Sequence, residues 1–126
     1  MPNLGNVIFY FIFVIKSSNR MSQVQIIQVT TEKQLSDFIK FPMDLYKNNQ
    51  NFVPSLINDE KNIWNPKENP ALAYSDAKQF LAYKNNQLVG RIAVMVNHKE
   101  AKELGIEKVR FGWLDFIDDQ EVSKAL

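Results

Sequence analysis

Residues 79–119 read QFLAYKNNQLVGRIAVMVNHKEAKELGIEKVRFGWLDFIDD and decide the fold. Two apolar runs, 80–83 and 88–96, flank a polar corner that contains Asn85 and Asn86. Asparagine tolerates the positive φ angles that short hairpin loops require. The pattern therefore predicts a β-hairpin.

The second run of this hairpin is apolar on both alternations apart from Arg91. A strand that buries both of its faces lies in the interior of its sheet, so we expect a central strand over residues 89–96. Gly90 within it indicates a bulge or a close approach by another backbone.

Residues 109–117 predict a third strand, with Phe111, Trp113 and Asp115 on one alternation and Gly112, Leu114 and Phe116 on the other. Asp115 is then a carboxylate near the end of a largely apolar strand. It is the first candidate for a chemical role.

Composition narrows the possible functions. The chain has 126 residues, a formal net charge of +1, no cysteine and a single histidine, His98. This length fits one domain, and the near-neutral charge gives no indication of nucleic-acid binding. The absence of cysteine excludes disulfides, thiolate metal sites and a cysteine nucleophile. We expect no metal site and a cytoplasmic protein.

Residues 1–20 contain the apolar run VIFYFIFVI at positions 7–15, about half of the roughly 20 residues needed to span a bilayer as a helix. No basic segment precedes the run, and no small-residue cleavage site follows it. Three interpretations remain open: upstream translation before a start at Met21, a membrane or export segment, or an element of the fold. We expect an extension that forms no stable membrane span.

Residues 24–29 predict a first strand. Thr31 and Gln34 have the spacing of a capping box, which predicts a helix with a bend or restart at Pro42. A second helix is expected to begin near Pro54. Glu60 lies within its apolar stripe, either as a carboxylate at the edge of the core face that is held by a nearby cation or as an acid that faces substrate.

The predicted order is a strand, one or two helices and three strands in meander order, with a helical turn at 99–104 ended by Gly105. We therefore expect an α/β (α+β) fold in which helices flank a mixed, mostly antiparallel sheet.

Several consecutive phrases resemble a bacterial GNAT-like family of the acyl-CoA N-acyltransferase superfamily. They are FIKFPMDLYKNNQNFVPSLINDEK at 38–61, FLAYKNNQLVGRIA at 80–93, VGRIAVMVNHK at 89–99 and FGWLDFIDDQEVSKAL at 111–126. The resemblance covers about four fifths of the chain and identifies residues 21–126 as the N-terminal half of such a domain.

The resemblance implies direct transfer of an acyl group from acetyl-CoA or another acyl-CoA to an amine. It places Asp115 where the family usually carries a glutamate that relays the proton of the attacking amine. It also implies that the main chain of Phe116 and Ile117 lines the cofactor cleft. An amine that attacks a thioester must be neutral, whereas an ordinary amine near pH 7 is an ammonium ion. A carboxylate or a carboxylate-bound water can accept the extra proton.

Two features depart from the family pattern. Its glycine-rich pyrophosphate loop should follow this strand, but Asp118 and Asp119 stand there and would cap the helix amides themselves. The helix from Gln120 stops at Leu126, so we expect a fragment that is inactive alone. The alternative is an inactive binding or interaction module with the same fold.

Three further residues are candidates for substrate binding: Arg91, Trp113 and His98. Arg91 either holds a substrate carboxylate or pairs within the sheet. Trp113 either lines an acyl pocket or belongs to the core. His98 either assists a proton relay or is a loop histidine bonded to backbone. We expect a small-molecule or amine substrate, and the sequence does not specify the oligomeric state.

Overall fold

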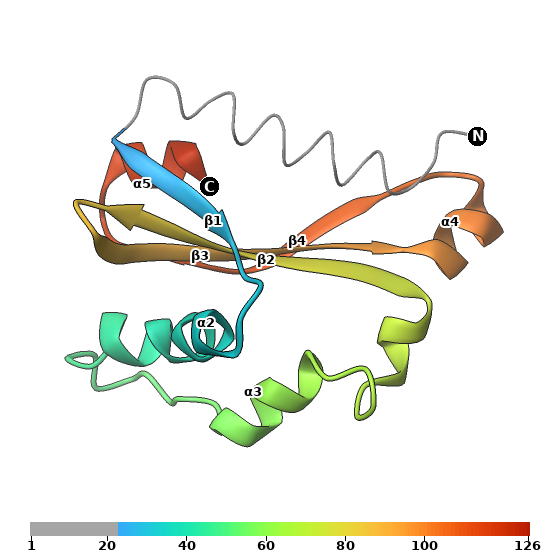
Figure 1. The fold of residues 1–126 in the computed structure, drawn as a ribbon, viewed down its shortest axis with the longest axis horizontal. Helices are drawn as coiled ribbons and strands as arrows, with labels where there is room; N and C mark the ends of the chain where they lie inside the picture. The colour runs from blue at the N-terminus through green and yellow to red at the C-terminus, as the bar shows by residue number, and fades with distance from the viewer. Residues whose placement is uncertain (1–22) are drawn as a thin grey trace.

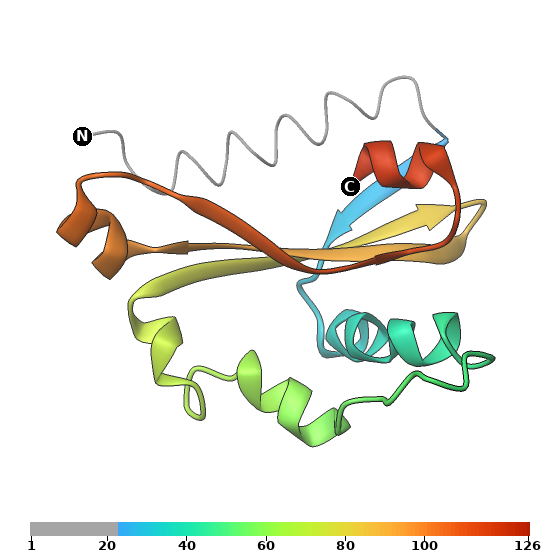
Figure 2. The same ribbon diagram turned by 180° about the vertical axis from the view of Figure 1, so that it is seen from behind.

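Four antiparallel strands form the sheet, in the order β1-β2-β3-β4, in a computed structural model that describes residues 23–126. The strands are β1 (Val24–Gln28), β2 (Ser75–Lys84), β3 (Gln87–Asn97) and β4 (Val109–Phe116). Helices α2 (Glu32–Leu45) and α3 (Ile57–Ile63) cover one face, and α5 (Gln120–Ala125) packs on the other (Figures 1 and 2). The predicted α+β class is confirmed. The expectations for residues 1–20 lie outside the described residues.

The predicted hairpin is formed by β2 and β3. Its loop consists of Asn85 and Asn86, whose φ angles of 51° and 60° are both positive, as a type I′ turn requires. Because β2 begins at Ser75, the hairpin is longer than its apolar run indicated.

The prediction that residues 89–96 form a central strand is also confirmed, because β3 pairs with β2 on one side and β4 on the other. Ala93 packs with Phe38 and Ile39 of α2, whereas Ile92 and Val94 face the opposite side of the sheet. Both faces of β3 are therefore buried, which explains its nearly continuous apolar sequence.

The register of β4 corrects one prediction. Phe111 lies opposite Val94 and Asp115 lies opposite Arg91, with a register shift between these pairs. Val94 and Arg91 are an odd number of residues apart, so Phe111 and Asp115 lie on opposite faces, although strict alternation put them together. The β-bulge that causes this shift contains Trp113, which has a φ angle of +50°.

Local signals place the start of α2 and the end of α4 correctly. Thr31 and Gln34 form both hydrogen bonds of the predicted capping box, and α2 continues through Pro42. The turn expected at 99–104 is α4 (His98–Leu104), and Gly105 ends it with a φ of 65°. A 3₁₀ helix, η1 (Pro70–Ala73), precedes β2.

The start predicted for the second helix is wrong. Helix α3 begins at Ile57, three residues after Pro54, and Leu56 is 71% exposed. A proline favours a first helical turn but does not force one.

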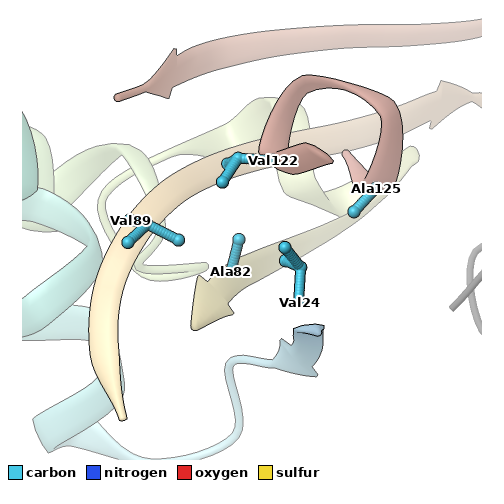
Figure 3. Close-up of a cluster of buried hydrophobic side chains, with 5 residues drawn as sticks. All are labelled: Val24, Ala82, Val89, Val122 and Ala125. Carbon is cyan, nitrogen blue, oxygen red and sulfur yellow. The ribbon is translucent and has the colours of Figure 1, made fainter. Parts of the chain in front are cut away.

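A small core forms where α5 crosses the sheet. Val122 and Ala125 of α5 meet Val24 of β1, Ala82 of β2 and Val89 of β3, and all five side chains converge in Figure 3. This cluster fixes the chain that follows β4.

Gly90 lies beneath this helix. A Cβ atom added there would be 2.7 Å from Leu126 Cδ1, 3.1 Å from Phe116 Cβ and 3.2 Å from Val122 Cγ1. The register shift in the β2–β3 pairing also falls beside it, after Ala82. The expected bulge or close approach is therefore present, although side chains make the approach.

The variant Gly90→Ala should destabilise the fold by about 1–3 kcal/mol, because the added methyl overpacks the contact between β3 and α5. Gly112→Ala is the matched control, since a Cβ there meets no atom within 4 Å. Urea unfolding followed by circular dichroism measures both free energies of unfolding. Equal effects of the two substitutions would contradict this account of Gly90.

Candidate functional site

A hydrogen-bonded chain of side chains lies on the sheet face beneath α2. Arg91 donates from Nε to Asp115 Oδ2 at 2.8 Å, and its Nη2 is also 2.8 Å from that oxygen. Tyr46 donates its hydroxyl proton to Asp115 Oδ1 at 2.9 Å. The Arg91 and Asp115 side chains are 9% and 18% exposed. Both oxygens of Asp115 are therefore held in place by the protein.

Arg91 also contacts α2, and this contact depends on Pro42. Pro42 has no N–H, so the carbonyl of Phe38, four residues earlier in α2, lacks its usual helical donor. Arg91 Nη1 donates to that carbonyl at 2.8 Å, and the guanidinium carbon lies 4.9 Å from the centre of the Phe38 ring. The break in the helical ladder thus becomes a binding point for the guanidinium group.

A cavity of about 120 Å³ opens beside this chain of residues. Arg91 and Asp115 form part of its wall, with Tyr46, Ser55 and Glu60, and the apolar residues Ile39, Pro42, Met43 and Phe52 complete it. Its volume is below the 300–1,000 Å³ typical of sites that enclose a drug-sized ligand. It suits a small polar group of a substrate.

Glu60 reaches this cavity from α3. Trp113 donates its indole N–H to Glu60 Oε2 at 3.2 Å, and its ring centroid lies 4.9 Å from that of Trp64. Trp113 also packs against the core cluster formed by α2 and the sheet. Trp113 therefore belongs to the core, which is one of its two predicted roles, and its indole also orients Glu60. It is not part of the cavity wall, and its role in an acyl pocket stays a prediction.

Tyr46 remains protonated across the neutral range. Its hydrogen bond to Asp115 raises the pKa of the phenol, and burial adds to the effect. Tyr46 was not among the candidates named from the sequence. A half-buried phenol needs a hydrogen-bond partner, but the burial of Tyr46 is known only from the structure.

The two residues whose main chain the resemblance assigns to cofactor binding differ in their hydrogen bonds. Ile117 donates its N–H to Val89 O at 2.9 Å and accepts from Asp119 N at 2.7 Å, so both of its main-chain groups are used within the protein. Because successive amides of a strand point to opposite sides, the N–H of Phe116 points to the outer edge of β4. Within the described residues, β4 pairs only with β3.

The expected capping of the last helix is confirmed. Asp119 accepts from Glu121 N at 2.8 Å, and Lys84 Nζ lies 2.7 Å from Asp119 and 2.6 Å from Glu121. The hydrogen bond from Lys84 lowers the pKa of Asp119, and the hydrogen bond to Asp119 raises the pKa of Lys84. A side-chain carboxylate therefore caps the N-terminus of α5.

His98 does not join the site. It is the first residue of α4, so the loop position considered for it is wrong, and its Nε2 lies 3.0 Å from Asp76 Oδ2. It follows Arg91 by seven residues, nearly all within β3, which at strand spacing corresponds to roughly 20 Å. Helix α4 lies at the opposite end of the sheet from α5 (Figure 1).

None of the helices within residues 23–126 has the length and apolar character needed to cross a membrane. This part of the chain also contains no group of three or more acidic or histidine side chains placed to hold a metal ion.

Two bacterial proteins are similar in sequence. The chain is 30% identical to Protein YghO of Escherichia coli (strain K12) over 113 residues, which are 89% of this chain and 29% of that protein. It is 26% identical over 106 residues to bacterial ceramide synthase of Caulobacter vibrioides (strain NA1000 / CB15N), covering 83% of this chain and 28% of the relative. The chain thus spans less than a third of the length of these curated relatives. No family model matches it, and no solved structure matches it significantly.

The variant Arg91→Met should destabilise the fold by about 3 kcal/mol, because it leaves the Asp115 carboxylate without its cation. The double variant Arg91→Met/Asp115→Asn should recover part of this loss, with a coupling free energy of about 1–3 kcal/mol in urea unfolding.

The exposed pair Lys33–Asp37 provides the control for this cycle, since its side chains are 86% and 33% exposed. Its coupling should stay near 0.3–0.5 kcal/mol. A coupling between Arg91 and Asp115 as small as that of the control would show that the two residues do not anchor each other.

Proposed function

We propose that this chain provides the amine-binding part of a GNAT-like N-acyltransferase, which transfers an acyl group directly from acyl-CoA to an amine. The observation that carries the proposal is the cavity itself. It brings Asp115 and Glu60 together with Tyr46 on one sheet face. Carboxylates within a small, partly apolar cavity provide what an amine nucleophile needs: a counterion and an acceptor for its proton.

The chemistry balances without a covalent enzyme intermediate. The bound ammonium ion loses a proton to a carboxylate of the cavity, directly or through a water molecule, and becomes a neutral amine. Its nitrogen then attacks the thioester carbonyl, the new C–N bond replaces the C–S bond, and the proton that nitrogen loses on forming the amide goes to the departing coenzyme A thiolate. Arg91 and Tyr46 hold Asp115 in one orientation, and such fixed geometry lowers the barrier.

The name of one relative supports this reaction class. That protein is called a ceramide synthase, and a ceramide contains an amide between a long-chain amine and a fatty acyl group. By analogy, an N-acylation fits this chain. The proposal for the acyl donor rests on the resemblance described above, and the edge of β4 at Phe116 is the expected place for its thioester arm.

We expect the acceptor amine to carry an apolar substituent. Met43 and Ser55 line both the cavity and a shallower hollow of about 490 Å³, which Pro54, Leu56 and Ile57 also line. Leu56 is 71% exposed and Val53 beside it in sequence is 84% exposed. An apolar substituent that leaves the cavity past Met43 would cover part of this surface.

A second candidate function is a binding or interaction module without catalysis. The capped N-terminus of α5 favours it, because Asp119 would repel a polyphosphate there. The two candidates differ in one measurable event, the release of free coenzyme A.

The complete gene product, mixed with palmitoyl-CoA or acetyl-CoA and n-octylamine, should release coenzyme A thiol in proportion to the amide formed. A thiol reagent measures this release, and the 126 residues contribute no cysteine background. Asp115→Asn should lower kcat/KM at least tenfold. Asp118→Asn, an exposed acid outside the cavity, is the control and should retain activity.

No amine-dependent thiol release with either acyl-CoA would contradict the transferase proposal. In that event, a rise in Tm caused by acyl-CoA would favour the binding module, because a ligand that binds only the folded state raises its stability.

A further inference from the structure

We infer that Glu60, rather than Asp115, binds the ammonium group of a ligand, and that the cavity selects primary ammonium ions. The inference deepens the proposed function by naming the residue that receives the acceptor amine. As a statement about ligand binding, it can be tested without any acyl transfer.

The charges around the cavity do not balance. Its ionisable lining consists of Glu60, Asp115 and Arg91, together with the phenol of Tyr46. Arg91 is paired with Asp115 through two nitrogens. Within residues 23–126 no lysine, arginine or histidine forms an ion pair with Glu60, so one negative charge of the wall lacks a cation. A cationic ligand would supply it, and an anionic ligand would be repelled.

Hydrogen bonds separate the roles of the two acids. Asp115 already accepts from Arg91 on one oxygen and from Tyr46 on the other. Glu60 accepts from the Trp113 indole on Oε2, and in the described part of the chain no donor contacts Oε1. An incoming N–H therefore finds its free carboxylate oxygen on Glu60. The indole holds the carboxylate in position for that bond.

The other polar groups of the cavity suit a primary ammonium. The Tyr46 hydroxyl donates its hydrogen bond to Asp115, so its oxygen can still accept hydrogen bonds, and the Ser55 hydroxyl can accept as well. Together with Glu60 they offer three acceptors for the three N–H donors of a primary ammonium ion. The Tyr46 and Phe52 rings, with centroids 5.1 Å apart, add aromatic surface that attracts a cation.

The test is a titration of the complete protein with n-butylammonium chloride, without acyl-CoA, observed at the tryptophan indole N–H signals in ¹⁵N NMR. The 126 residues contain two tryptophans, Trp64 and Trp113, and the variant Trp113→Phe assigns their signals. The Trp113 signal should shift saturably, because its N–H is bonded to Glu60. Tetramethylammonium, which has no N–H donor, should bind at least tenfold more weakly.

Glu60→Gln should weaken n-butylammonium binding at least tenfold, and Glu60→Asp, which retains the charge, should weaken it less. Glu103→Gln removes the same charge from the exposed surface of α4 and should leave the affinity unchanged. Thermal unfolding of each variant confirms that the compared proteins are folded.

Equal affinity of wild-type protein and Glu60→Gln would overturn the inference. So would a loss of binding in Asp115→Asn with none in Glu60→Gln. Saturable binding without acyl transfer would refute the proposed function and retain the ammonium site. Acyl transfer by Glu60→Gln with an unchanged KM for the amine would support the proposed function and refute the ammonium site.

Discussion

The Arg91 guanidinium is the point on which the site depends. It belongs to the central strand β3 and contacts α2 through the Phe38 carbonyl and β4 through Asp115. A guanidinium group in such a buried place is stable only if its donors are used, and the fork of nitrogens meets that need. If residue 42 were not a proline, its N–H would donate to the Phe38 carbonyl within the helix, and that carbonyl would not need Arg91. A helix irregularity thus determines where a catalytic candidate is held.

The bulge in β4 provides the second constraint. It moves Phe111 away from the face that carries Asp115, although regular alternation would put Phe111, Trp113 and Asp115 on one face. A positive φ at a tryptophan costs of order 1 kcal/mol or more and persists only where surrounding contacts enforce it. Packing against Trp64 and the bond to Glu60 are those contacts. The same residue that breaks the strand therefore orients an acid of the cavity.

Local chemistry explains which parts of the fold could be predicted from the sequence. The Asn85–Asn86 turn, the Thr31 capping box and the Gly105 helix end each depend on a few adjacent residues. Asp115, Arg91 and Glu60 could be named from the sequence as separate candidates, but their contacts with one another could not. Tyr46, the partner of Asp115, is 69 residues away in sequence, and no sequence pattern indicates the hydrogen bond between them. The bulge at Trp113 and the pairing of His98 with Asp76 could not be predicted either, because nothing adjacent in sequence specifies them.

Hydrogen exchange of the arginine side chains tests the central claim most directly. If Arg91 is anchored by Phe38 and Asp115, its guanidinium N–H protons should exchange at least a hundredfold more slowly than those of Arg110, which is 52% exposed. Asp115→Asn should remove much of this protection while β3 amides stay protected. Exchange at Arg91 as fast as at Arg110 in the wild-type protein would contradict the account.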